Sequence, residues 1–164
     1  METLQQDDLD LKDGIAAIAL MNDYVPVMQI IAQNIHDNGL DIKNRDLILK
    51  QHSIEKIEHL KDYALFLIID YIKLVLNDYA ISEKERENVT FLKYYFKIKE
   101  GDFYKDRYDE VVKVLNRQFE KIYEDGIVTN EEAIHKFEVQ DLFDLSHDQF
   151  FEIKENYLSK QNET

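Results

Sequence analysis

Apolar side chains along the chain recur every three or four positions, and hardly any stretch alternates with a period of two. This spacing places apolar side chains on one face of a helix, so we expect an all-α protein without strands. Only four Gly and one Pro interrupt the 164 residues, which agrees with helices joined by short turns. The widest apolar stripe belongs to a predicted central helix and comprises Ile54, Ile57, Leu60, Ala64, Leu65, Ile68, Ile72, Val75 and Leu76.

Helix ends are predicted from capping residues, Pro and Gly. Pro26 suits the first turn of a helix that ends at Asn38-Gly39, Asn44 suits a cap, and Ser53 precedes the central helix. We expect a single compact domain over residues 1–164, with about seven helices beside a short one at 44–52, a disordered acidic segment at 1–12 and a frayed end at 157–164. The predicted helices cover residues 12–23, 26–36, 44–52, 53–77, 82–95, 103–123 and 129–142, and a last helix starts at Ser146.

A comparison of the chain with itself indicates a duplication at an offset of 47 residues. Residues 64–103 align with residues 111–150 without a gap, and the apolar positions of the first helix in each copy match. Each copy is therefore predicted to be a helical hairpin: a helix, a tight turn, a second helix and a further turn. Four aligned pairs are identical, namely Asp78 with Asp125, Glu85 with Glu132, Phe96 with Phe143, and Phe103 with Phe150.

The turn of each predicted hairpin contains the pattern Asp-x-x-[Ile or Val]-[Ser or Thr]-x-x-Glu, at residues 78–85 and 125–132. Ser82 and Thr129 are favoured N-cap residues, and each is followed three positions later by Glu, which is the sequence signature of a capping box. An Asp in a turn can accept a hydrogen bond from its own backbone. On this interpretation the motif only marks where helices end and begin.

A second interpretation of the same carboxylates is a cation site. The segment 125–132 is similar to the second half of an EF-hand loop, although Lys121 and Tyr123 stand where the first and third ligands would be. If the two hairpins pack about a pseudo-twofold axis, their turns pool four carboxylates, and oxygen ligands suit calcium, magnesium or manganese. No organic cofactor is expected, because the four Gly are isolated and form no phosphate-binding loop. The candidate metal ligands are Asp78, Glu85, Asp125 and Glu132.

The duplicated hairpins, the acidic turn at 125–132 and the following Phe143-x-Leu145-Ser146 resemble the TerB-like domain of bacterial tellurite-resistance and stress-response proteins. The resemblance covers about residues 54–155. It implies an all-helical fold, metal chelation by the acidic residues, and a role as an interaction module in membrane-associated or phage- and stress-defence assemblies. The first copy departs from the family pattern at Tyr79, where a Gly is expected.

Charge narrows the range of partners. The net charge is −14, so the chain repels phosphate backbones; we expect no direct nucleic-acid binding, and a basic protein or a cation as partner. Residues 124–164 carry eleven acidic and three basic side chains. We take Asp141, Asp144 and Asp148 as candidate contacts to a basic partner. The alternative function is an acidic cognate inhibitor, either an immunity protein or a nucleic-acid mimic, of a basic nuclease or toxin.

Catalysis and export have little support in the residues. The chain has no Cys, which excludes disulfides and zinc-thiolate sites, and Ser53, Ser82 and Ser146 are predicted at helix starts rather than in a nucleophile motif. An enzyme using the paired carboxylates on a metal-bound water would need an open coordination position and a pocket. No signal segment and no apolar run of membrane-spanning length occur, so we expect a cytoplasmic, non-enzymatic protein without membrane insertion.

Overall fold

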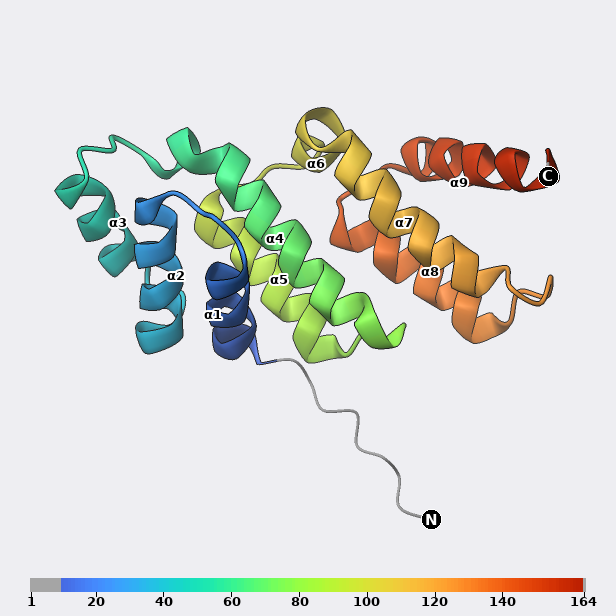
Figure 1. Cartoon of the computed structure of the whole chain (residues 1–164), viewed down its shortest axis with the longest axis horizontal. Helices are drawn as coiled ribbons and strands as arrows, with labels where there is room; N and C mark the ends of the chain where they lie inside the picture. The colour runs from blue at the N-terminus through green and yellow to red at the C-terminus, as the bar shows by residue number, and fades with distance from the viewer. Residues whose placement is uncertain (1–9, 164) are drawn as a thin grey trace, which may run out of the picture.

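The computed structural model describes residues 10–163, and within this range the chain is helical throughout, with short connections and no β-strand (Figure 1). The predicted all-α class is confirmed. The α-helices are α1 (Leu11–Met21), α2 (Pro26–Asn38), α3 (Ile42–Gln51), α4 (Lys61–Val75), α5 (Glu83–Phe96), α6 (Asp102–Asp106), α7 (Tyr108–Ile122), α8 (Asn130–Leu142) and α9 (His147–Asn162). Two short 3-10 segments are η1 (Ile57–Leu60) and η2 (Leu76–Asp78).

The duplication is visible in the bounds of the helices. A shift of 47 residues maps both ends of α4 onto the ends of α7. The same shift maps the first residue of α5 onto the first residue of α8. The α4–α5 hairpin and the α7–α8 hairpin lie next to each other, with α4 against α7 and α5 against α8 (Figure 1). The two copies therefore form neighbouring units of similar construction.

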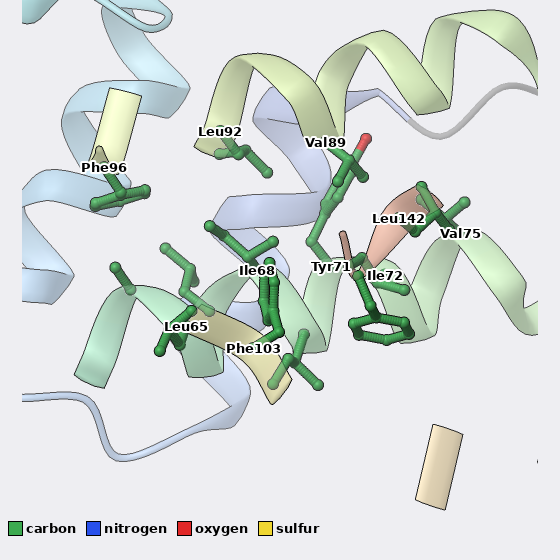
Figure 2. Packing of buried hydrophobic residues seen from close by; sticks show 14 of the residues in the cluster. Leu65, Ile68, Tyr71, Ile72, Val75, Val89, Leu92, Phe96, Phe103 and Leu142 are labelled. Carbon is green, nitrogen blue, oxygen red and sulfur yellow. The ribbon is translucent and has the colours of Figure 1, made fainter. Parts of the chain in front are cut away.

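The remaining helices extend this array at both ends. Helix α1 packs against α2 and α4, α2 packs against α3, and α9 packs against α7. One continuous cluster of buried apolar side chains runs from Ile15 in α1 to Ile153 in α9. Figure 2 shows its centre, where side chains of both hairpins and of α6 meet: Leu65, Ile68, Tyr71, Ile72, Val75, Val89, Leu92, Phe96, Phe103 and Leu142.

The central helix begins later than its apolar stripe predicts. Residues 52–53 form a turn, residues 54–56 are irregular, η1 follows, and α4 starts only at Lys61. Ser53 is not an N-cap: it has a φ of 57° and lies just beyond the end of α3, where the amide of Ile54 donates to the carbonyl of Leu49 at 2.9 Å. This is a left-handed helix termination, which satisfies the last carbonyls of α3. The position predicted as a helix start is therefore a helix end.

Two further boundaries differ from the prediction. The expected helix at 103–123 is divided at Arg107, whose φ of −139° separates α6 from α7. The Arg107 guanidinium lies 3.9 Å from the ring centroid of Phe66, and Nη2 donates to the carbonyl of Asp62 at 3.3 Å. Helix α3 begins two residues before Asn44, and its cap is Asp41, which accepts from the Asn44 amide at 3.1 Å.

Two predictions concern the chain ends, namely disorder at 1–12 and fraying at 157–164. Of the segment 1–12 expected to be disordered, residues 1–9 lie outside the described residues, whereas Asp10 caps α1 and Leu11 begins it. Helix α9 is continuous to Asn162. The expected fraying over 157–164 stays a prediction. Within residues 10–163, no helix has both the length and the apolar character needed to cross a membrane.

Candidate functional site

The repeated turns contain the two predicted capping boxes. The hydroxyl of Ser82 accepts from the Glu85 amide at 3.1 Å, and the Glu85 carboxylate accepts from the Ser82 amide at 2.9 Å. In the second copy the corresponding distances, between Thr129 and Glu132, are 3.2 and 2.8 Å. Both boxes satisfy backbone donors that a helix start leaves without partners. The capping interpretation of the motif is confirmed.

The Asp residues of the motif hold their own turns. Asp78 Oδ1 accepts from the Ala80 amide at 3.1 Å, and Asp125 Oδ1 accepts from the Ile127 amide at 2.9 Å. At the position where the sequence departs from the family pattern, Tyr79 has a φ of 58°, and the equivalent Gly126 has a φ of 76°. The two turns therefore share a left-handed residue despite the different side chain, at a cost in strain for Tyr79.

The predicted metal ligands do not converge. In the part of the chain that the structure describes, no three His, Asp or Glu side chains form a group that could hold a metal ion. Instead, each of the two Asp carboxylates accepts from a turn amide, and each of the two Glu carboxylates completes a capping box. Cation binding by Asp78, Glu85, Asp125 and Glu132 therefore stays a prediction.

One acidic residue from each turn influences the pKa of the same imidazole, that of His135. His135 in α8 is half-buried, and its Nε2 lies 2.8 Å from Oε1 of Gln118 in α7. Burial lowers the pKa of His135, because the charged form loses solvation, while the negative charges of Asp78 and Glu132 oppose this shift. The structure thus places an acid from each copy near this histidine, for which the sequence showed no pattern.

The three candidate partner contacts have different environments. Asp144 is committed to the fold: its Oδ1 lies 2.9 Å from Nζ of Lys93, which also donates to the carbonyl of Asp141 at 3.2 Å. Burial lowers the pKa of Lys93, and the carboxylate of Asp144 opposes that shift. The side chains of Asp141 and Asp148 are exposed and have no ion-pair partner within residues 10–163. Of the three candidates, Asp141 and Asp148 are therefore open to a partner, and Asp144 is not.

The most unusual surface of the second copy is an apolar one on α8. Within this helix only Val139 and Leu142 are buried. Ile134 and Phe137 on the same helix are 58% and 65% exposed. We call the following exposed residues the α8 surface: Ile127, Val128, Ile134 and Phe137.

The first copy supplies an internal comparison for this surface. The positions equivalent to Ile134 and Phe137 are Glu87 and Thr90, which are also exposed. The same two positions face solvent in both copies, and they are polar in one and apolar in the other. Packing within the hairpin therefore does not require an apolar side chain there. Sequence reasoning missed this feature, although the mismatch at aligned positions was a signal that could have revealed it.

Acidic side chains surround the apolar ones on the same helix. Glu131, Glu138 and Asp141 lie three or four residues from Ile134 or Phe137, and side chains at these spacings are neighbours on a helix surface. The α8 surface thus combines large apolar side chains with a negative border.

No family model matches this chain, and no curated protein or solved structure is significantly similar to it. The TerB-like resemblance therefore depends on the residues of the repeated turns and on Phe143, Leu145 and Ser146. An all-α fold is shared by proteins of many functions, so function has to be argued from local surfaces and sites.

Proposed function

We propose that this chain is a non-enzymatic, TerB-like interaction module that docks a protein partner through the α8 surface. One observation carries the proposal: Ile134 and Phe137 are exposed and apolar at positions where the first copy has Glu87 and Thr90. Exposed apolar groups that the fold does not require are typical of binding surfaces, and aromatic residues are enriched at their centres. The capping roles of Ser82, Thr129 and Ser146 support a function without nucleophilic catalysis.

The charges around the α8 surface indicate the chemistry of the partner. Glu131, Glu138 and Asp141 favour basic side chains around an apolar group that contacts Phe137. Opposite charges at the border of an interface mainly accelerate association and select the partner, whereas buried apolar contacts supply most of the affinity. The partner is therefore a basic protein with an exposed apolar side chain. The resemblance places such a module in a bacterial stress or defence assembly.

The acidic inhibitor remains a second candidate, because residues 124–164 carry eleven acidic side chains and Asp141 and Asp148 are exposed. The two functions differ in what binding depends on. An inhibitor of a basic nuclease or toxin depends chiefly on Asp141, Asp148 and the salt concentration, since charge dominates its association. A docking module depends chiefly on Ile134 and Phe137.

The test replaces the α8 side chains by those of the first copy, in the double variant Ile134→Glu and Phe137→Thr. Its matched control carries Glu87→Ala and Thr90→Ala at the equivalent positions. Wild type and both variants serve as bait in extracts of the source cells, and each protein that the wild type retains is then purified and its Kd measured. We expect one basic protein whose Kd rises at least tenfold with the double variant and stays unchanged with the control.

All three baits should unfold at closely similar temperatures, because the replaced side chains face solvent in both copies. A partner that binds the double variant as tightly as the wild type contradicts the proposal. If that partner instead dissociates when Asp141 and Asp148 are both changed to Asn, the inhibitor function is favoured.

A further inference from the structure

A cavity of about 260 Å³ lies between the end of α4 and the middle of α7, on elements that do not form the α8 surface. Its walls contain three cationic side chains and no acidic one, in a chain whose net charge is −14. The lining residues are Lys73, Leu76, Asn77, Lys113, Val114, Arg117 and Gln118.

Two of these cationic side chains, Lys113 and Arg117, come from α7. Lys113 and Arg117 are four residues apart, which places them on the same side of the helix. Neither has an ion-pair or hydrogen-bond partner for its side chain within residues 10–163. Lys73, from the last turn of α4, has its Nζ 3.3 Å from Oδ1 of Asp70 and is thus partly neutralised. The walls of the cavity are therefore cationic, although Asp109, Glu110 and Glu120 lie within one turn of these two cations on α7.

A buried amide adds hydrogen-bond donors to the same cavity. Gln118 is only 3% exposed, and its Oε1 accepts from Nε2 of His135 at 2.8 Å. Its Nε2 group has two N–H donors, for which the part of the chain that the structure describes offers no acceptor. Because Gln118 lines the cavity, a bound ligand can accept from this amide.

We propose that this cavity binds a small molecule that carries a phosphate group. A phosphate monoester has a charge of about −1.5 to −2 at pH 7, which suits the cationic side chains of Lys113 and Arg117. The Arg117 guanidinium offers parallel donors suited to two phosphate oxygens, and Gln118 donates to a third. The volume admits a phosphate with a few carbon atoms, which Leu76 and Val114 would contact. This site is independent of the proposed docking function.

The experiment uses the full chain with three probes at equal ionic strength, namely inorganic phosphate, glycerol 3-phosphate and malonate. Binding is measured by the rise in the midpoint of thermal unfolding and by titration calorimetry. The site variant is Lys113→Gln with Arg117→Gln. Its control, Lys84→Gln with Arg86→Gln, makes the same change in net charge on α5, away from the cavity.

We expect both phosphate probes to raise the midpoint of thermal unfolding of the wild type and of the control variant. The site variant should bind both phosphate probes at least tenfold more weakly than the wild type does. A stronger effect of glycerol 3-phosphate than of inorganic phosphate assigns the ligand to the organic phosphates, and equal effects assign it to free phosphate. Malonate should bind at least tenfold more weakly than either. The proposal is overturned if no phosphate probe binds at millimolar concentration, if both variants respond alike, or if malonate binds as well as phosphate.

Discussion

The two capping boxes offer an internal test of how burial changes the contribution of one interaction, because the motif is the same and the surroundings differ. Glu85 is only 4% exposed, whereas Glu132 is only partly buried and its cap Thr129 is exposed. The two carboxylates accept from the N-cap amide at 2.9 and 2.8 Å, so the geometry of this hydrogen bond is nearly equal. We predict that Glu85→Ala destabilises the protein more than Glu132→Ala.

The magnitude follows from what replaces the lost acceptor. After Glu132→Ala, water reaches the Thr129 amide, so the loss is that of an ordinary exposed cap, about 0.5–1 kcal/mol. After Glu85→Ala, the half-buried Ser82 amide loses a charged acceptor, which costs about 1.5–3 kcal/mol. We therefore expect a difference of about 1–2 kcal/mol in the free energy of unfolding. Glu85→Gln should cost less than Glu85→Ala, because Gln keeps an acceptor oxygen, as Gln149 does in the third capping box at Ser146.

The free energies are measured by urea unfolding, followed by far-ultraviolet circular dichroism and by tyrosine fluorescence, with coincident transitions as the condition for two-state treatment. Thermal unfolding provides a second measure, because each kcal/mol shifts the unfolding midpoint by about 2–4 °C in a chain of this size. Equal losses for Glu85→Ala and Glu132→Ala, or a larger loss for Glu132→Ala, would refute the reasoning that burial decides the contribution of the box.

Two further predictions concern the neighbourhood of the turns. Burial lowers the pKa of His135, so as the pH falls below about 6.5 the unfolded state binds the proton first and the folded state loses stability. We expect the free energy of unfolding to decrease from pH 7.5 to 5.5 by more in the wild type than in His135→Gln, as measured by urea unfolding; equal decreases would contradict this. If Asp78 and Asp125 ligate a cation, millimolar calcium, magnesium or manganese raises the unfolding midpoint of chelator-treated protein. The double variant Asp78→Asn with Asp125→Asn keeps the acceptor of each turn and should lose that rise, so a rise that persists in it refutes ligation by these residues.

Features that depend on residues close together in the chain could be predicted from the sequence. The helical class follows from apolar spacing, and the capping boxes at Ser82 and Thr129 involve side chains and amides only three residues apart. The duplication was also predictable, because residues 64–103 align with residues 111–150 without a gap. The same offset of 47 residues maps the bounds of α4 onto those of α7. In each case the physical cause is local: the hydrogen bonds and the helix face are set within one or two turns.

Features that depend on neighbours distant in the chain could not be predicted. Ser53 is a favoured N-cap type, yet it takes the left-handed position at the end of α3. The division at Arg107 goes with the packing of its guanidinium over Phe66, which lies on another helix. Among the acidic candidates, Asp144 became a structural ion-pair partner only because α5 brings Lys93 to it.

The sequence by itself therefore determined the helices, the repeated hairpins, their caps and the excess of negative charge, because these properties follow from the order and types of nearby residues. The tertiary structure decided which side of each helix is covered. It left Ile134 and Phe137 exposed on α8, and it joined Lys73 of α4 to Lys113 and Arg117 of α7 around one cavity. Periodicity identifies an apolar stripe, but only the packing of neighbouring helices determines which of its side chains are buried and which charges meet.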